Sequence, residues 1–368
     1  MFVIKYIRFS NFKFFPLIFL LIACGSAQIT NNSIKIKYLD EYVIPADYEF
    51  EGHLVGGLSD LDYDGTYFYT VTDNPRNPVI FKFSIPIENY KIQDIVFDEA
   101  IKIHSDTLVF DSEGILYHPD SNVFIVSSEG SINNNKNPFI TSLTGEGTVI
   151  NHFELPEYFS VSNEKGLRHN AVFEGLSWNI DKEGIWAATE LPMISDGAKP
   201  KLYKTYSSVR FTYFDTDSKK PIKQFAYKLD RLRKVPLLPF SINGVSGILK
   251  IAPHQFIVIE RAFSAGYGSK GNRVRLYLSD AREATNTISI NNLRSNKKAI
   301  IPAQKQLLFD FKSIKKQLSH GFIDNIEGIV LGPRLPNGNQ SLILISDNNF
   351  NSFSNQINQV ILMEIIEN

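Results

Sequence analysis

Acidic residues recur in this sequence beside a glycine and at the ends of hairpin-like segments. In the segment 173–190, FEGLSWNIDKEGIWAATE, Glu174 precedes a glycine and a short apolar run, a turn-forming Asp-Lys-Glu-Gly follows, and the second run ends at Glu190. An antiparallel hairpin brings its two ends to the same level, so Glu174 and Glu190 are expected to lie near each other. Close carboxylates repel unless a cation or hydrogen-bond donors lie between them. The pattern therefore predicts a site built on paired acids.

The same arrangement recurs four more times along the chain. The further units are 57–60 with 67–73, 113–115 with 123–129, 246–248 with 256–260, and 327–329 with 341–347. Two of them lack the acid before the glycine, because Gly56 and Ser246 stand in its place. A ring built from the five units is therefore expected to carry acids on an incomplete set of its sides.

Two more strand-like runs lie between successive hairpins, so each unit supplies four strands. The units repeat at intervals of roughly 60 to 80 residues, which suits four-stranded blades with variable loops. The sequence predicts an all-β protein, a single β-propeller with four-stranded antiparallel blades, in which five blades are favoured and six are possible. Only one strand, 359–366, follows the last hairpin, so the N-terminal run 34–44 is expected to complete that blade and close the ring.

The first strand of each propeller blade lines the central axis, so the hairpin acids should converge at one end of the channel. These acids are Asp73, Glu113, Glu129, Glu174, Glu190, Glu260, Glu327 and Asp347. Ca²⁺ or another hard divalent cation binds carboxylate oxygens and would offset their charge. Two alternatives stay open. The nearby Arg76, Arg168, Arg261 and Arg273 could supply the positive charge, or each acid could accept hydrogen bonds from backbone N–H groups of the next blade.

Other chemical motifs are missing from the sequence or stand in the wrong context. The run 266–271, GYGSKG, matches G-x-G-x-x-G, but a strand-like segment follows it where a dinucleotide-binding loop would open a helix. There is no G-x-S-x-G or H-E-x-x-H, and the seven histidines lack zinc-ligand spacing. The stretch 309–318 is the only plausible amphipathic helix, and a strand running into a loop explains it as well.

The N-terminal segment has the pattern of an export signal. Residues 1–23 combine a basic start with an apolar core too short to span a bilayer, and LIAC at 21–24 is similar to a bacterial lipobox. Cys24, the single cysteine, is the expected lipidation site, and residues 24–33 read as a polar tether. The sequence thus predicts a lipid-anchored cell-envelope protein, facing the periplasm or in the outer membrane, whose propeller domain spans 34–368.

The net charge of the chain indicates which classes of partner it can bind. The formal net charge is −1, and it becomes −4 when the leader and its Lys5, Arg8 and Lys13 are removed. A mildly acidic surface argues against nucleic acid, which is bound by clustered lysines and arginines. We expect a monomer that meets the membrane only through its lipid anchor and takes a small anionic substrate.

Taken together, residues 55–366 resemble a family of bacterial exported propellers described as "esterase-like activity of phytase", or phytase-like. The motifs that carry the resemblance are DSEG at 111–114, SSE at 127–129, Asn170 with FEGL at 173–176, ELP at 190–192, DG at 196–197, IER at 259–261, DNIEG at 324–328 and SDNNF at 346–350. Each motif is short, but their order and combination are specific.

The resemblance implies a metal-dependent hydrolase of a phosphoester or other small ester, with calcium or another divalent cation as cofactor. It assigns as metal ligands Asp73, Glu113, Glu129, Glu174, Glu260, Glu327 and Asp347. Glu174, Glu190 and Glu327 are the expected catalytic acids. Arg261, Arg273, Asn170 and Asn325 are the expected substrate-binding residues, because a guanidinium offers two N–H groups to a phosphate or carboxylate. Alternatives from other classes are a non-catalytic ligand-binding propeller and a protein-binding scaffold.

Overall fold

The computed structural model describes residues 34–105, 108–162, 166–351 and 356–367, so the predicted leader, tether and Cys24 lie outside the described residues. Within these ranges the structure consists of strands and five short 3₁₀ helices, with no α-helix: η1 (Ile132–Asn134), η2 (Glu157–Phe159), η3 (Gly268–Gly271), η4 (Phe311–Ile314) and η5 (Asn349–Asn351). The stretch 309–318 is thus the end of a strand followed by η4. No helix in the described part is long and apolar enough to cross a membrane.

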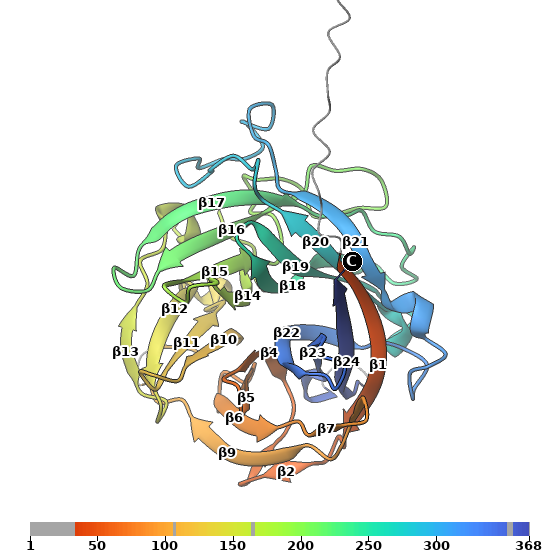
Figure 1. The fold of residues 1–368 in the computed structure, drawn as a ribbon. Helices are drawn as coiled ribbons and strands as arrows, with labels where there is room; N and C mark the ends of the chain where they lie inside the picture. Colours follow the sequence, from red (N-terminus) through yellow and green to blue (C-terminus); the bar gives the residue numbers. More distant parts are fainter. Residues whose placement is uncertain (1–33, 106–107, 163–165, 352–355, 368) are drawn as a thin grey trace, which may run out of the picture. The chain divides into compact units, whose positions relative to one another are not determined.

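Five four-stranded antiparallel sheets are arranged as the blades of a propeller (Figure 1). Blade 1 contains β4 (Leu58–Tyr63), β5 (Phe68–Thr72), β6 (Val79–Ser84) and β9 (Val96–Lys102). Blade 2 contains β10 (Ser112–His118), β11 (Val123–Ser128), β12 (Phe139–Thr144) and β13 (Val149–His152). Blade 3 contains β14 (Phe173–Trp178), β15 (Gly184–Thr189), β16 (Ser208–Asp215) and β17 (Pro221–Lys228). Blade 4 contains β18 (Ser241–Ala252), β19 (Gln255–Ser264), β20 (Asn272–Asp280) and β21 (Gln304–Asp310).

Blade 5 joins the first and last strands of the described part of the chain. It contains β22 (Asn325–Arg334), β23 (Gln340–Asp347), β24 (Asn358–Glu367) and, as its outer strand, the N-terminal β1 (Ile34–Ile44). β1 pairs with β24 from Ile34–Glu367 to Ile44–Asn358. This pairing confirms the predicted five blades and their closure by the N-terminal strand. Two small hairpins lie outside the blades: β2 (Glu49–Phe50) with β3 (His53–Leu54), and β7 (Ile87–Glu88) with β8 (Lys91–Ile92).

The hydrophobic core is divided among the interfaces between blades. One apolar cluster fills each of the five interfaces, because alternate residues of a strand face the two neighbouring blades. Between blades 3 and 4, for example, the ring of Phe256 packs against Trp186 and Phe211 at centroid distances of 5.1 and 5.8 Å. Truncating such a buried aromatic residue to alanine costs about 3–5 kcal/mol. These clusters hold the blades in a fixed arrangement around the axis.

The innermost strands contact one another in the order β4, β10, β14, β18, β22 and back to β4. Glycine makes this close approach possible. A Cβ added to Gly175 would lie 3.0 Å from the Cα of Gly247, and one added to Gly328 would lie 2.7 Å from the carbonyl carbon of Asp60. The glycines of the repeat are therefore needed where neighbouring backbones meet at the axis. The run 266–271 leads through η3 into β20, so it is a connection between strands, as expected.

Candidate functional site

The acid–glycine pair of the repeat is a β-bulge. In blades 2 to 5 the ladder between the first two strands shifts by one residue at this pair. The residues left out of the ladder are Glu113, Glu174, Ser246 and Glu327. A bulge turns the side chain of its extra residue out of the normal alternation. The bulges thus direct three acids and a serine toward the axis.

A second set of side chains comes from the second strand of each blade, on the same rim as the first set. The first and second strands pair there at Leu58–Thr72, Ser112–Ser128, Phe173–Thr189, Val245–Glu260 and Ile326–Ser346. The residues that come next are Asp73, Glu129, Glu190, Arg261 and Asp347. In blade 4, Arg261 therefore occupies the position that an acid has in the other blades. The predicted Glu260 lies one residue before that position. A shift of one residue reverses the face of a strand.

Blade 1 also departs from the predicted alignment. Counted from the pair Leu58–Thr72, Ser59, and not Gly56, is equivalent to the acids of the other blades, and Asp60 is equivalent to their glycine. Ser59 itself pairs with Val71, and the ladder shifts only after it. Asp60 adopts a left-handed conformation with φ 57°. Its carboxylate accepts hydrogen bonds from the backbone N–H groups of Leu61 at 2.9 Å and of Ile115 and Leu176 at 3.3 Å. Asp60 thus links blades 1, 2 and 3 at the axis.

These two sets make up what we call the axial cluster: Ser59, Asp73, Glu113, Glu129, Glu174, Glu190, Ser246, Arg261, Glu327 and Asp347. Seven acids and one arginine share it. Arg261 donates to Glu327 Oε1 at 2.8 Å and to Glu190 Oε1 at 3.2 Å, and also to the side-chain oxygen of Asn325. Burial opposes ionisation of Arg261, but the charges of Glu327 and Glu190 outweigh it and raise its pKa. Arg261 is therefore a permanent cation among the acids.

Asn325 extends this network to blade 5. Its side-chain amide donates to Glu327 Oε1 at 2.8 Å and to Asp347 Oδ2 at 3.3 Å. Ser59 donates to the other oxygen of Glu327 at 3.4 Å, so Glu327 has a partner on each oxygen. Two residues predicted to bind substrate, Arg261 and Asn325, therefore lie within the cluster and contact its acids.

Three acids of the axial cluster have fewer partners. Within the described residues, the carboxylates of Glu113 and Glu174 receive no hydrogen bond, and Asp73 Oδ1 is buried without one. Glu174 is only 7% exposed. By contrast, Glu129 accepts a hydrogen bond from the backbone N–H of Val172 at 2.5 Å. Glu174 is buried, whereas Glu113 and Asp73 are half-buried, so a proton or a cation at this side of the cluster would offset their charge.

The pKa values of the acids in the cluster are raised, mainly because the carboxyl groups are shielded from solvent. Burial, reinforced by neighbouring carboxylates, raises the pKa of Glu129 to about 8 and that of Asp73 to about 6. Burial also raises the pKa of Glu327 to about 7, although Arg261 opposes the shift. The pKa values of Glu113 and Glu174 are raised well above the usual range, first by burial and then by neighbouring acids. Several of these groups therefore exchange protons near neutral pH.

The other predicted site residues lie elsewhere. Glu260 is fully buried on the opposite face of β19, where it accepts hydrogen bonds from Tyr227 at 2.9 Å and Asn243 at 2.8 Å. Arg273 pairs with Asp310 at 2.5 Å between the two outer strands of blade 4. Asn170 is exposed in the connection that precedes β14. Glu260 is thus separated from the acids with which it was grouped.

Sequence reasoning did not single out the acids of β4. Asp62, like Asp60, is buried, and its Oδ2 accepts hydrogen bonds from the backbone N–H of Tyr117 at 2.7 Å and from the indole of Trp178 at 3.1 Å. Burial raises the pKa of Asp62 to about 6. The available signal was the pair of acids two residues apart in the otherwise apolar LSDLDY, which places both on one face of a strand. These acids tie the blades together.

The axial cluster can bind a cation, hold protons and orient a polar group. Among the described residues no three His, Cys, Asp or Glu side chains form a ready-made metal cluster. The donor set consists of carboxylate oxygens, which are the ligands of hard cations such as Ca²⁺ and Mg²⁺. Both ions also accept water as a ligand, and Mg²⁺ is usually bound through one or two carboxylates together with substrate phosphates.

A family model for phytase-like proteins, described as "Esterase-like activity of phytase", matches residues 53–350. No curated protein matches the chain.

Similar solved structures include propellers and carbohydrate-active enzymes. A Dos1 propeller is 10% identical, with a TM-score of 0.36, over 86% of this chain and 72% of the other. The catalytic domain of a Coprinopsis cinerea GH62 α-L-arabinofuranosidase is 9% identical, with a TM-score of 0.45, over 90% and 98%. A putative glycoside hydrolase from Bacteroides ovatus is 8% identical, with a TM-score of 0.43, over 89% and 92%. Similarity at this level carries no inference about activity.

Proposed function

This chain belongs to the phytase-like family, and we propose that it is an exported, lipid-anchored hydrolase that cleaves a phosphoester or another small ester at the axial cluster. The observation that carries the proposal is the pair Glu113 and Glu174. Both point to the axis from neighbouring bulges, and neither receives a hydrogen bond from a described residue. Membership of the family suggests ester hydrolysis as the reaction, and the acids without hydrogen-bond donors suggest where it would occur.

The residues at this place fit a divalent cation. Glu113 and Glu174 would hold it, and Asp73, whose Oδ1 is buried without a partner, would add negative charge nearby. When bound, such a cation lowers the pKa of a water ligand and screens the charge of a phosphoryl group. The three acids are free for this role because Arg261 is occupied by Glu190 and Glu327 on the other side of the cluster.

The chain's own residues supply proton transfer and orientation. The pKa of Glu327, about 7 through burial, keeps a proton available near neutral pH, which suits donation to a leaving oxygen. Arg261 and Asn325 fix the carboxylate of Glu327 in place. The Nε of Arg261 is buried without an acceptor and would suit an anionic substrate. Roles for Arg273 and Asn170 in substrate binding stay predictions.

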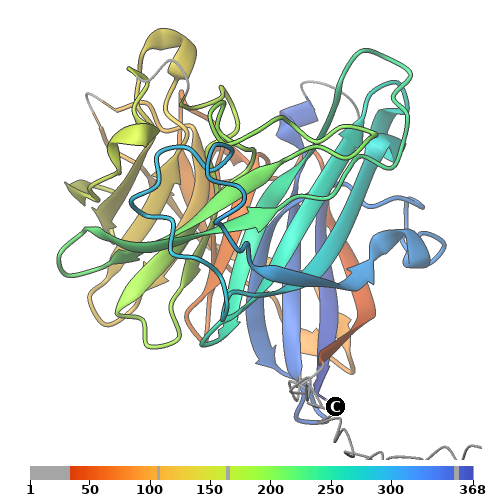
Figure 2. The ribbon, with the colours of Figure 1, turned by 90° about the horizontal axis from the view of Figure 1, so that it is seen from above.

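β1 forms the outer edge of blade 5 beside β24, where Figure 2 shows it in red next to the blue strands. The proposed lipid anchor at Cys24 would hold the propeller at the cell envelope as a monomer, where it would reach small soluble esters.

The test is a screen of phosphomonoesters and carboxylesters with and without chelator. We expect turnover that excess chelator abolishes, and a loss of about tenfold to a hundredfold in Glu174→Gln with an unchanged melting temperature or a higher one. Glu146→Gln, which neutralises an exposed acid in a turn of blade 2, is the matched control and should keep full activity. Full turnover in excess chelator would contradict the proposal.

A non-catalytic binding propeller is the second candidate. It is favoured by the pairing of Glu190 and Glu327 with Arg261, because two of the three expected catalytic acids are held by a residue of the chain itself. In this case the screen shows no turnover with any ester, while a cation or cationic ligand still raises the melting temperature.

A further inference from the structure

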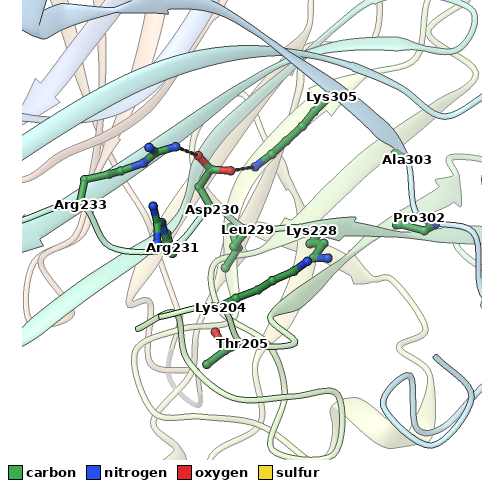
Figure 3. Close-up of a pocket in the computed structure, with 10 residues that line it drawn as sticks. All are labelled: Lys204, Thr205, Lys228, Leu229, Asp230, Arg231, Arg233, Pro302, Ala303 and Lys305. Carbon is green, nitrogen blue, oxygen red and sulfur yellow. Dashed lines mark hydrogen bonds and ion pairs between the residues drawn. The ribbon is translucent and has the colours of Figure 1, made fainter. Parts of the chain in front are cut away.

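A pocket with a cationic lining lies where blades 3 and 4 meet, away from the axis (Figure 3). Its volume is about 400 Å³, which is enough for a small molecule. We call it the basic pocket. Its lining comes from three separate stretches of the chain: Lys204 and Thr205, then the run 228–231 with Arg233, and finally Pro302, Ala303 and Lys305. Five of these side chains are lysine or arginine, and one is acidic.

The single acid of the basic pocket is already compensated. Asp230 lies 3.1 Å from Lys305, 3.2 Å from Arg233 and 2.8 Å from Arg275, and it also accepts a hydrogen bond from Tyr277 at 2.9 Å. Burial opposes ionisation of Asp230, but Lys305 and the other donors outweigh it and lower its pKa. Figure 3 shows Asp230 between Arg233 and Lys305. Asp230 therefore leaves the other positive charges of the pocket uncompensated.

Three cations of the pocket have no such partner. Lys204, Lys228 and Arg231 form no ion pair and donate no side-chain hydrogen bond to any described residue. Lys228 ends β17, whereas Lys204 and Arg231 lie in connections and are exposed, and the buried Leu229 and Ala303 supply the apolar part of the lining. Like charges that line one hollow repel one another unless an anion lies between them.

The basic pocket is separated from the axial cluster by the alternation of β19. Arg261 faces the axial acids, whereas its neighbour Glu260 faces the other way and binds Lys305 of the pocket wall. The two regions thus use opposite faces of one strand. A ligand in the basic pocket does not have to pass through the axial cluster.

We propose that the basic pocket binds a small, soluble anion that carries two or more phosphate groups. Each phosphate monoester carries about −1.5 to −2 charges at neutral pH, so two of them match the three uncompensated cations in a compact volume. Arg231 and Arg233 can each offer a pair of N–H groups to phosphate oxygens. The site is independent of the proposed hydrolysis, because none of its lining residues belongs to the axial cluster.

Calorimetric titration of the propeller domain with tripolyphosphate, in chelator and at low salt, tests the proposal. We expect saturable binding that weakens as salt is added, and a loss of about tenfold or more in the double variant Lys204→Ala/Lys228→Ala. Lys91→Ala/Lys102→Ala is the matched control, since it removes two exposed lysines, one from the β7–β8 hairpin and one from blade 1, and should bind like the unmodified protein. Melting temperatures verify that both double variants are folded.

Two further titrations test whether the anion binds at the basic pocket and whether the pocket prefers phosphate groups. Glu174→Gln should leave tripolyphosphate binding unchanged, whether or not the protein proves to be a hydrolase. Citrate, whose charge is spread over carboxylates, should bind about tenfold more weakly. The proposal is overturned if tripolyphosphate does not bind, if Lys204→Ala/Lys228→Ala binds as tightly as the control, or if citrate binds equally well.

Discussion

The axial cluster and the basic pocket lie on opposite faces of β19, and they carry opposite charges. In the axial cluster one buried arginine is surrounded by seven acids, whereas in the basic pocket one acid is surrounded by cations. In both places the minority charge is paired, and part of the surplus charge is left without partners among the described residues. The surplus therefore indicates which ligand each region would bind: a cation at the axis and an anion at the blade margin.

Removing the minority charge of the axial cluster should have the largest effect. Arg261→Ala leaves Glu190 and Glu327 buried without their cation, which is expected to cost about 3–5 kcal/mol of unfolding free energy and to abolish any esterase activity. Denaturant unfolding measures the loss. Arg273→Ala is the control, because its pair with Asp310 is partly exposed and worth less than about 1 kcal/mol. Equal losses in the two variants would mean that Arg261 does not hold the cluster together.

The axial cluster also depends on close backbone contact, which the basic pocket does not need. In Gly328→Ala the new methyl group would meet the backbone of Asp60 and the side chain of Ile345, so a loss of about 1–3 kcal/mol is expected from overpacking. Thermal or denaturant unfolding checks this value. A variant as stable as the unmodified protein would show that the inner strands can move apart without cost.

The two regions should respond to different ranges of pH. The folded pKa of Glu129, about 8, and that of Glu327, about 7, lie above their unfolded values, so their contribution to stability is present at low pH and is lost as pH rises through about 7 to 8. Asp230 has the opposite sign: its pKa is lowered in the folded state, so its contribution is lost only below the unfolded value of 3.8. Without added metal, stability should therefore fall between about pH 5 and 8, by about 1.4 kcal/mol per pH unit for each group that is protonated in the folded state and ionised in the unfolded state. Glu129→Gln should flatten this slope and Asp230→Asn should not, as thermal unfolding across the range will show.

The smallest effect is expected from a cation of the basic pocket. Lys305→Ala removes one partner of Glu260, which keeps hydrogen bonds from Tyr227, Asn243 and the backbone N–H of Asp230. The expected loss is about 1 kcal/mol, measured by denaturant unfolding. A loss of unfolding free energy as large as that of Arg261→Ala would show that the remaining hydrogen bonds of Glu260 do not compensate for the missing lysine.

Much of the fold could be predicted because its signals are local and repeated. The apolar runs, their turns and the missing fourth strand of the last blade together specify a five-bladed ring closed by 34–44, and the structure has these features. The acid–glycine pairs also indicated which residues approach the axis. What they could not indicate is the bulge, which is a property of strand pairing and decides where Glu113, Glu174 and Glu327 point.

The details of the site depended on single-residue register. Glu260 and Arg261 are adjacent, and only the pairing of β18 with β19 places the arginine among the acids and the glutamate on the other face. In blade 1, Asp60 stands at the place in the first strand where the other blades have their glycine. Aligning the first unit of the repeat on Gly57 was therefore wrong. The basic pocket combines residues about 100 positions apart in sequence, for which no local pattern exists.

The most direct test of the central claim is a calorimetric titration of metal-free protein at neutral pH with Ca²⁺, Mg²⁺ and Mn²⁺ in turn. The claim is that the unsatisfied acids of the axial cluster bind a divalent cation. We predict saturable binding of at least one ion, weakened about tenfold or more in Glu113→Gln/Glu174→Gln and unchanged in Glu146→Gln. Absence of binding by all three ions, or equal binding in the double variant, would contradict the account.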